Sequence, residues 1–467
     1  MRTAVLHAAL FALVISWGCS HTSPLDASDA GKTMTYLSGM PGFDIECLPV
    51  EPDSLTAFDL YLSVPYSSLI FEKMTEGFRA RFEISARLSD RLGGAVEEEI
   101  DWPETTTVER YQATQSSEPI VVVKRVQVAP GSYRVDVSLE DLLSGKKARV
   151  AQGLTLPDPA DPGPSLGRIT LLTGKGPRIP QISFFVKEQR DSLLCAVDAY
   201  NLEGERWRGV RLSVIRFPAD TTIAQVPYWF NVMPLPLGHG LIDFSRSDTV
   251  SASRLERVRG KGLQRLGFLI PPLRKGMYRF DAEAEGRGIA GGDTVLSASR
   301  YYSVRGPGYP RPVTYGELLA AATYLMTLKE AATFHAAATV EEQKKQFESF
   351  WLTCGGGAER ASALIKKYYG RVEEANRLFT TTREGWKSDR GLLYCVLGPP
   401  SSITNQLETQ TWYYDLTGNA ADNTYVFKRI IKQGEGLTVE DYILYRQSSY
   451  ENFWTRMLSR WRSGDPL

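Results

Sequence analysis

The sequence predicts a multidomain chain in which two β-sandwich domains precede an α+β domain. Its 467 residues exceed what one ordinary hydrophobic core supports, so several domains are expected. Up to residue 306 the apolar residues tend to alternate with polar ones, which is the period of a strand with one buried face. After residue 312 they recur at helical spacing, and short strand-like runs follow.

The first eighteen residues have the pattern of an export signal. Arg2 supplies a positive start, and residues 4–15 are apolar apart from His7. Such a run is too short to span a bilayer core of about 30 Å but suits the core of a signal peptide. The ending at Gly18-Cys19 resembles a bacterial lipobox, in which Cys19 becomes the lipidated first residue. We therefore expect an exported protein that is anchored at Cys19, with a plain secreted protein as the alternative.

Changes in composition predict the domain boundaries. The chain after Cys19 begins with small, polar residues, as in a tether, and a stretch rich in proline, glycine and aspartate separates the two β-regions. Order is expected to begin near Ala57. The predicted sequence of parts is a signal peptide (1–18), a lipid-anchor tether (19–56), a first β-sandwich (57–157), a linker (158–167), a second β-sandwich (168–306) and an α+β domain (312–467).

A short internal echo relates the two β-regions. Residues 129–136 (APGSYRVD) and 274–281 (RKGMYRFD) both place Tyr-Arg-apolar-Asp two residues after a glycine. The pattern resembles the late-strand signature of fibronectin-III-like and immunoglobulin-like domains, in which the tyrosine packs at a corner of the sandwich. The resemblance implies two related sandwiches. Such domains serve as spacers or binding modules, and the fold alone does not define a function.

The last third of the chain predicts helices followed by a small sheet. Thr314 with Glu317, and Thr339 with Glu342, have the form of capping boxes, which begin helices. A third amphipathic stretch covers residues 365–379, and the glycines after Cys354 separate it from the second helix. The expected later elements are strands at 392–397, 411–415, 425–430 and 442–445, and a final helix at 450–461.

The most distinctive string is GWKSDRG at residues 385–391, followed by a turn at Gly398-Pro399-Pro400. With its surroundings at 314–446 it resembles the GWxTD domain, a family of bacterial envelope proteins with no established reaction. Ser388 stands where the family has threonine, which keeps a hydroxyl group. The candidate motif or partner-binding residues are Gly385, Trp386, Ser388, Asp389, Arg390, Gly391, Gly398 and Pro399.

These residues also have structural interpretations, which we favour over a ligand or partner pocket. Trp386 is large enough to close a core where the helices meet the sheet. Ser388 and Asp389 can bond to nearby backbone amides. Arg390 could pair with Asp389 or Glu384. Gly391 would allow close backbone approach at the start of a strand.

The composition argues against several other classes of function. Lys plus Arg and Asp plus Glu each total 54, so no excess of positive charge favours nucleic-acid binding. The histidines are isolated, no Gly-x-Ser-x-Gly string occurs, and no cysteine cluster suggests zinc. We therefore predict no catalytic residue, metal or cofactor. The four cysteines after Cys19 are expected to be buried and reduced rather than disulfide-bonded: Cys47, Cys195, Cys354 and Cys395.

The expected function is an interaction or assembly module in the bacterial cell envelope, held at the membrane through its N-terminal lipid and bound to an envelope protein. The alternative is an envelope hydrolase that acts on glycan or peptide, with its site in the C-terminal domain. A filled core around Trp386 and an exposed apolar patch would favour the module. A deep polar pocket with converging carboxylates would favour the enzyme.

Overall fold

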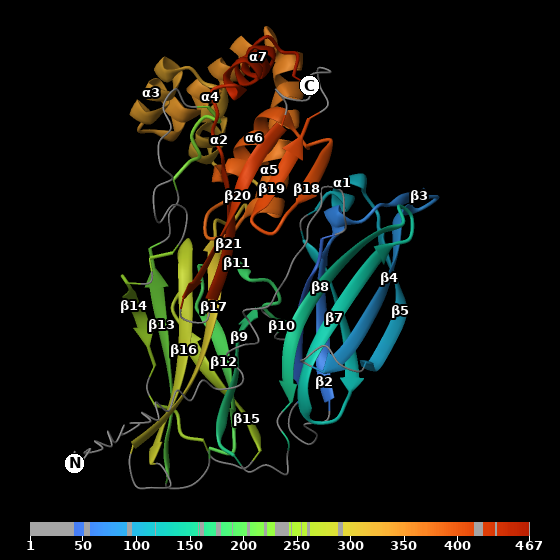
Figure 1. Cartoon of the computed structure of the whole chain (residues 1–467), viewed down its shortest axis with the longest axis vertical. Coiled ribbons are helices and arrows are strands. Elements are labelled where there is room, and N and C mark those ends of the chain that lie inside the picture. The colour runs from blue at the N-terminus through green and yellow to red at the C-terminus, as the bar shows by residue number, and fades with distance from the viewer. Residues whose placement is uncertain are drawn as a thin grey trace, which may run out of the picture.

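The computed structural model is strand-rich in its N-terminal part and largely helical in its C-terminal part (Figure 1). We call its parts the first β-unit (42–156), the second β-unit (163–306) and the C-terminal unit (312–466). No helix among the described residues has the length and apolar character needed to cross a membrane. The structure describes residues 42–466 except 51–56, 91–95, 117, 157, 159–162, 174–178, 189, 203–205, 219–221, 229–241, 244, 254, 259–261, 288–292, 415–423 and 435–436.

The first β-unit consists of two sheets around one core. Leu60 and Leu62 of one sheet and Ile84 and Val137 of the other are fully buried in the same apolar cluster. Along strands of both sheets, buried residues alternate with more exposed ones, so one face of each sheet points into the core. One sheet has the order β1 (Asp44–Pro49), β2 (Ala57–Pro65), β6 (Pro119–Gln127). The other has the order β3 (Glu72–Met74), β4 (Gly77–Asp90), β7 (Gly131–Asp141), β8 (Lys146–Leu156), with β5 (Val96–Val108) also paired to β4. Two short helices, η1 (Tyr66–Ser68) and α1 (Tyr111–Thr114), complete it.

Ordered structure begins earlier than the sequence predicted. β1 lies inside the range expected to be a tether and pairs with β2 along its whole length. Ile45 and Cys47 are fully buried in the core of the first β-unit, and this burial holds the strand in place. A six-residue strand is too short to stand out beside a polar segment. The predicted signal peptide and Cys19 lie outside the described residues.

The second β-unit repeats the arrangement of two sheets around one core. Val197 and Phe268 of one sheet and Val214 and Phe280 of the other share an apolar cluster. One sheet has the order β10 (Ile179–Pro180), β9 (Ser165–Thr173), β12 (Leu193–Tyr200), β15 (Leu263–Ile270). The other has the order β11 (Phe185–Lys187), β17 (Asp293–Arg305), β16 (Gly276–Arg287), β13 (Trp207–Phe217), β14 (Asp248–Ala252), in which β11 is parallel to β17.

The internal echo corresponds to a shared local structure. Tyr133 on β7 donates a hydrogen bond to the carbonyl of Ala129 at 2.7 Å, and Tyr278 on β16 donates to the carbonyl of Arg274 at 2.8 Å. In both β-units the arginine that follows the tyrosine pairs with the aspartate two residues further along. Both tyrosines are almost fully buried. The same string therefore fixes the same bend at the start of a strand in each unit.

The C-terminal unit begins with helices and continues into a small sheet. Both expected capping boxes are present, and Thr327 with Glu330 forms a third. Gly356, at φ 65°, ends the second of the predicted helices, which is α4 in the structure, as expected. The helices are α2 (Tyr315–Ala322), η2 (Thr323–Leu325), α3 (Leu328–Ala336), α4 (Val340–Gly355), α5 (Ala358–Phe379), η3 (Gly385–Lys387), α6 (Asp389–Leu397) and α7 (Tyr450–Arg462). The sheet has the order β18 (Ser402–Asn405), β19 (Thr409–Tyr413), β20 (Thr424–Gly434), β21 (Leu437–Leu444).

The strand predicted at 392–397 is wrong, because these residues form most of the helix α6. The hydroxyl of Ser388 accepts a hydrogen bond from the amide of Gly391 at 3.0 Å and so caps the start of this helix. Every residue from Leu392 to Leu397 is buried. A helix buried all round lacks the apolar stripe by which helices are recognised in a sequence, and a short apolar run then resembles a strand.

Buried contacts join the three units. Between the two β-units, the fully buried carboxylate of Glu46 pairs with Arg300 at 2.8 Å and with Arg168 at 2.9 Å. Between the second β-unit and the C-terminal unit, Met277 and Val439 belong to one small apolar cluster. In Figure 1 the strand β21 accordingly reaches down to the sheet that contains β17.

Candidate functional site

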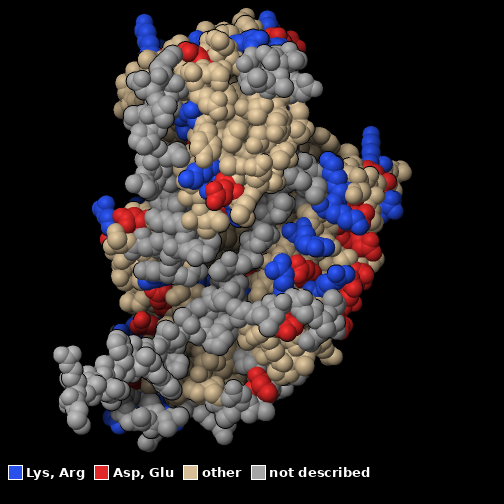
Figure 2. All heavy atoms as spheres, in the orientation of Figure 1, with Lys and Arg blue, Asp and Glu red and all other residues tan. Residues whose placement is uncertain are grey.

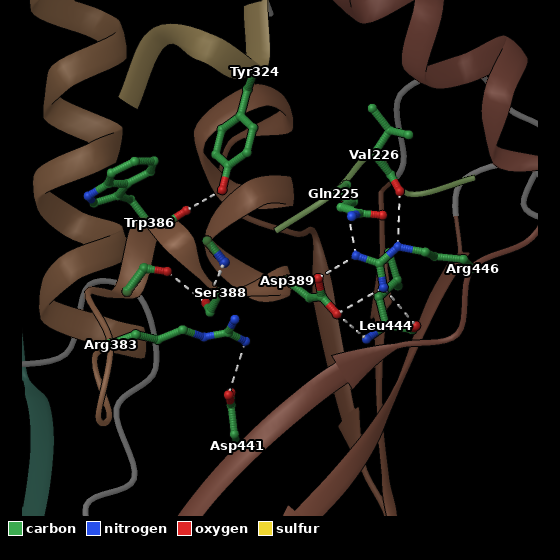
Figure 3. Close-up of polar contacts among 12 residues, drawn as sticks. Gln225, Val226, Tyr324, Arg383, Trp386, Ser388, Asp389, Asp441, Leu444 and Arg446 are labelled. Atoms are coloured by element: carbon green, nitrogen blue, oxygen red, sulfur yellow. Dashed lines mark hydrogen bonds and ion pairs between the residues drawn. The ribbon is translucent and has the colours of Figure 1, made fainter. Parts of the chain in front are cut away.

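The tryptophan of the motif lies in the core of the C-terminal unit, as the sequence predicted. Trp386 is 4% exposed, and its ring meets that of Tyr324 edge-on with centroids 6.0 Å apart. Its backbone is also held, because its carbonyl accepts a hydrogen bond from the Tyr324 hydroxyl at 2.8 Å (Figure 3). Its amide donates to Asn376 at 3.2 Å. The core around Trp386 is thus filled by protein side chains.

The two motif glycines are required by close packing of the backbone. A Cβ atom at Gly385 would lie 2.0 Å from the carbonyl oxygen of Ala375 on α5. A Cβ atom at Gly391 would lie 2.0 Å from the carbonyl oxygen of Gly385. Real Cβ atoms do not approach oxygen so closely, so α5, η3 and α6 meet backbone to backbone at this point. The close approach predicted for Gly391 is present, at the start of a helix rather than of a strand.

Ser388 uses its hydroxyl group within the motif. The side chain is fully buried and donates to the carbonyl of Gly385 at 2.7 Å while it accepts from the amide of Gly391. The residue therefore joins η3 to α6, in the role that the sequence predicted for a short polar side chain. Both hydrogen bonds of the Ser388 hydroxyl are made inside the protein, so this oxygen does not face solvent.

Asp389 extends the motif to the last strand and the second β-unit. Its carboxylate accepts from the amide of Leu444 at 2.8 Å and from both terminal nitrogens of Arg446, at 2.6 and 3.2 Å. The same guanidinium donates to the carbonyls of Gln225 and Val226, at 3.1 and 3.0 Å. Figure 3 shows Arg446 between the aspartate and this loop of the second β-unit. We call this arrangement the Asp389–Arg446 clamp.

Two further contacts hold the same boundary. The amide of Ala224 donates to the carbonyl of Lys387 at 2.9 Å. Glu384 pairs with Lys275 of the second β-unit at 2.5 Å and with Lys387 at 3.0 Å. The motif is therefore one of the places where the C-terminal unit is attached to the second β-unit, beside the cluster of Met277 and Val439.

The pairing predicted for Arg390 is wrong. Its guanidinium lies 4.1 Å from the ring centroid of Tyr442 and 5.0 Å from that of Phe379, while Asp389 and Glu384 pair with other cations. Burial lowers the pKa of Arg390, and the nearby charge of Asp441 partly opposes that effect. Stacking on aromatic rings suits a desolvated guanidinium.

The predicted turn at Gly398 is present, but it ends the helix α6 rather than a strand. Gly398 has a φ of 88°, a value that favours glycine, and its amide donates to the carbonyl of Tyr394 at 2.9 Å. A Cβ atom here would also lie 2.8 Å from a guanidinium nitrogen of Arg371. Pro399 follows it on the surface. The hydroxyl of Tyr414 donates to the Gly398 carbonyl at 3.0 Å and ties the turn to the sheet.

Some residues that complete the site carried no signal in the sequence. Arg446 follows β21 in a stretch without a motif, and the buried pair of Arg383 with Asp441, 3.1 Å apart, joins residues distant in the chain. A sequence shows a charged residue but not its partner across a fold. Tyr324 likewise appears in the sequence only as one aromatic residue near the end of a predicted helix, with no sign of its contact with Trp386.

The described cysteines are buried and free, which agrees with the predicted reduced thiols. Burial raises the pKa of Cys195 and Cys395, and raises that of Cys354 to about 11. A thiol of raised pKa is a poor nucleophile because the thiolate is scarce. Within the described ranges, no three His, Cys, Asp or Glu side chains gather in a way that could hold a metal ion.

A cleft of about 1140 Å³ opens where the three units meet. Its walls include Ile70 and Val121 of the first β-unit and Ile179 of the second, which are 55%, 37% and 39% exposed. The helix α5 closes it, with Glu373 held by Arg311 at 2.5 Å and by Arg377. No motif residue lines this cleft. Because the motif fixes α5 against the second β-unit, it determines the position of one wall.

Charged side chains of both signs are mixed on the surface of the first β-unit (Figure 2). Figure 2 shows Lys and Arg interleaved with Asp and Glu on the first β-unit. Three of the pairs on its strands are Arg87–Glu99 at 2.8 Å, Arg134–Asp136 at 2.8 Å and Lys147–Glu140 at 2.6 Å. Because positive and negative side chains are interleaved there, this surface lacks the extended positive potential that attracts a polyanion.

Comparisons with known proteins relate one part of the chain to a family. Residues 290–463 match the family model described as the GWxTD domain. The search of curated proteins gives no match. Among solved structures, the crystal structure of red sea bream transglutaminase matches with 12% identity and a TM-score of 0.18, over 56% of this chain and 31% of that one. That score is too low to relate the two folds.

Proposed function

We propose that this chain, whose residues 290–463 match the GWxTD domain, is an exported, lipid-anchored protein of the bacterial cell envelope that acts as an interaction or assembly module. The apolar lining of the cleft is the observation that carries the proposal. Ile70, Val121 and Ile179 are among the exposed large hydrophobic residues of the chain, and all three line this one cleft. Exposed apolar side chains that gather in a concave surface are typical of a binding site.

The motif supports this function indirectly, by holding the cleft in shape. The Asp389–Arg446 clamp and the Glu384–Lys275 pair attach the C-terminal unit to the second β-unit. The Glu46–Arg300 pair attaches the first β-unit from the other side. A cleft between units presents a defined surface only when the units do not move apart, so these contacts pre-organise it.

The two β-units are, in this proposal, fibronectin-III-like or immunoglobulin-like sandwiches that carry the C-terminal unit and contribute two walls of the cleft. Their equivalent tyrosines support this interpretation, because each bonds to the backbone four residues upstream, as in the tyrosine corner of such folds. Modules of this kind commonly serve as spacers and binding surfaces.

The alternative of an envelope hydrolase has less support. The carboxylate of Glu373, which faces the cleft, is bonded by Arg311 and Arg377. In the motif, Ser388 and Asp389 are buried and use their side chains within the fold. A general acid or nucleophile needs a side chain free to reach a substrate.

Photo-crosslinking in intact envelopes tests the interaction. A benzophenone amino acid replaces Ile179 in the cleft, and the matched control replaces Val250, which has nearly the same exposure, 41% against 39%, but lies on β14 away from the cleft. We expect one defined crosslinked envelope protein from position 179 and none from position 250. Identical products from both positions, or no product from either, would remove the basis of the proposal.

The anchor is tested separately, by mass spectrometry of the mature N-terminus. We expect a lipid-modified Cys19 as the first residue. An unmodified first residue would reduce the proposal from an anchored protein to an exported one, without affecting the cleft.

A further inference from the structure

The strand β6 has one edge that no described strand pairs with. It is the last strand of the sheet β1-β2-β6 and pairs with β2 along all nine of its residues. The backbone N–H and C=O groups on its other edge therefore have no partner strand in the described part of the chain. Such an edge is a template for another extended polypeptide.

Exposed valines accompany this open edge. Val122 and Val126 point into the core and are buried, whereas Val121 and Val123 point outward and are 37% and 50% exposed. Natural edge strands are commonly protected by proline or by charged side chains. Here Pro119 stands at the first position and the basic residues come at 124–125, so residues 120–123 (Ile-Val-Val-Val) are left unprotected.

The open edge is continuous with the cleft. Pro119 and Val121 line it, together with Ser63, which is paired with Val121 across the sheet. Ile70, the most exposed of the apolar cleft residues, belongs to the same β-unit. A strand added to β6 would thus run from the cleft along the margin of the first β-unit and cover Val121 and Val123.

We propose that β6 receives an extended segment of a partner polypeptide as the fourth strand of its sheet. This inference rests on the proposed role of the chain as an interaction module. The segment is apolar at alternate positions, where it covers the two valines, and acidic near Lys124. Arg125 already pairs with Asp59 at 2.8 Å, whereas Lys124 lies over the ring of Trp102 at 5.5 Å.

The charge of β6 argues for a partner strand rather than for a second copy of this chain. The strand contains two basic residues and no acidic one. Antiparallel pairing of two β6 strands about Val123 would place the Lys124 residues of the two copies diagonally on adjacent strands, about 8 Å apart. An acidic residue on a different polypeptide removes that repulsion.

A synthetic peptide tests the pairing directly on the purified protein. The probe has the length of β6, nine residues, and consists of alternating threonine and valine with one central glutamate and a fluorescent label. Two further peptides carry N-methyl groups, one at the odd and one at the even positions. A strand pairs through one edge only, so we expect one methylated peptide to bind as the parent does and the other to lose binding in fluorescence anisotropy.

A pair of variants locates the site. Val123→Lys places a charge in the covered stripe, and we expect it to weaken binding of the parent peptide about tenfold or more. Val295→Lys on β17 is the matched control, because Val295 has similar exposure at 57%, and it should leave binding unchanged. Equal effects of the two methylated peptides, equal effects of the two variants, or no binding of the parent peptide at millimolar concentration would each overturn the proposal.

Crosslinking separates this inference from the proposed function. With the benzophenone amino acid at position 123, we expect the same envelope protein that position 179 captures. Capture at 179 without capture at 123 would refute strand addition and leave the module intact. Capture at neither position would refute the module itself.

Discussion

Replacing Asp389 with asparagine should destabilise the attachment of the C-terminal unit. The side chain is 5% exposed and pairs with Arg446, itself 13% exposed, so Asp389→Asn leaves a largely buried cation without its anion. Breaking such a pair costs about 3–5 kcal/mol. Arg446 keeps its bonds to the Gln225 and Val226 carbonyls, and the asparagine oxygen can still accept from Leu444. We therefore expect the lower end of that range, about 3 kcal/mol.

Two measurements check this value. The first is thermal unfolding followed by tryptophan fluorescence, since the C-terminal unit contains Trp351, Trp386, Trp412, Trp454 and Trp461 in its core. A loss of about 3 kcal/mol corresponds to a fall in midpoint of about 6–12 °C for a unit of this size. The second is hydrogen exchange of the Ala224 amide, which donates to the Lys387 carbonyl across the boundary. Exchange there should become faster, because the clamp that holds its loop is weakened.

The control is Asp465→Asn, which breaks the pair with Arg460 at 2.9 Å, where the Asp465 side chain is 75% exposed. An exposed pair is worth less than about 1 kcal/mol, so this variant should melt close to the wild type. Equal midpoints for the two variants would show that the clamp does not stabilise the fold. A lowered midpoint with unchanged exchange at Ala224 would show that Asp389 acts within the C-terminal unit alone.

Three further predictions follow from the packing and the ionisable groups. Gly391→Ala should lower the free energy of unfolding by about 3 kcal/mol in urea titrations, because the added Cβ meets the Gly385 carbonyl at 2.0 Å. The control is Gly370→Ala on α5, where the added atom meets nothing within 4 Å, and this variant should be neutral or stabilising by up to about 1 kcal/mol. Equal losses of stability in the two variants would contradict the packing argument. Burial acts to raise the pKa of Glu384, but Lys387 and Lys275 outweigh it and leave the pKa below its ordinary value of 4.5. The contribution of the Glu384 carboxylate to stability is therefore complete above pH 4.5 and is lost as the pH falls through the lower, folded-state pKa. Glu384→Gln should flatten the dependence of the urea midpoint on pH in that acidic range. An unchanged slope would contradict the stabilising role of these ion pairs. Finally, Cys47, Cys195, Cys354 and Cys395 should react with Ellman's reagent only after unfolding, since all four are buried; fast labelling of the native protein would disprove this.

The sequence predicted the elements whose signals are local. The capping boxes at Thr314 and Thr339 begin helices because the side chain and the backbone that it bonds lie three residues apart. The amphipathic stretch at 365–379 lies on α5, and the strands predicted after 410 match β19, β20 and β21 with shifted ends. The burial of Trp386 and the bonds of Ser388 were also predictable, because both follow from size and from short-range geometry.

What the sequence could not predict depends on contacts between distant residues. The apolar run at 392–397 predicts a strand, whereas it forms most of the helix α6, because burial on every side removes the helical period of apolar residues. The partner of Asp389 proved to be Arg446, 57 residues later, rather than its neighbour Arg390. The cleft is assembled from residues of all three units, and no stretch of sequence contains its pattern. Long-range pairing is thus where prediction from one sequence fails for this chain.

The strand β17 has a consequence for where this chain can be divided. The family match starts at residue 290 and so includes β17, although this strand pairs with β16 over residues 293–304 and with β11 on its other side. The matched segment therefore contains one strand of the neighbouring sheet. A fragment that begins where the match begins would expose both edges of β17, and the upstream fragment would lose the strand that joins β11 to β16.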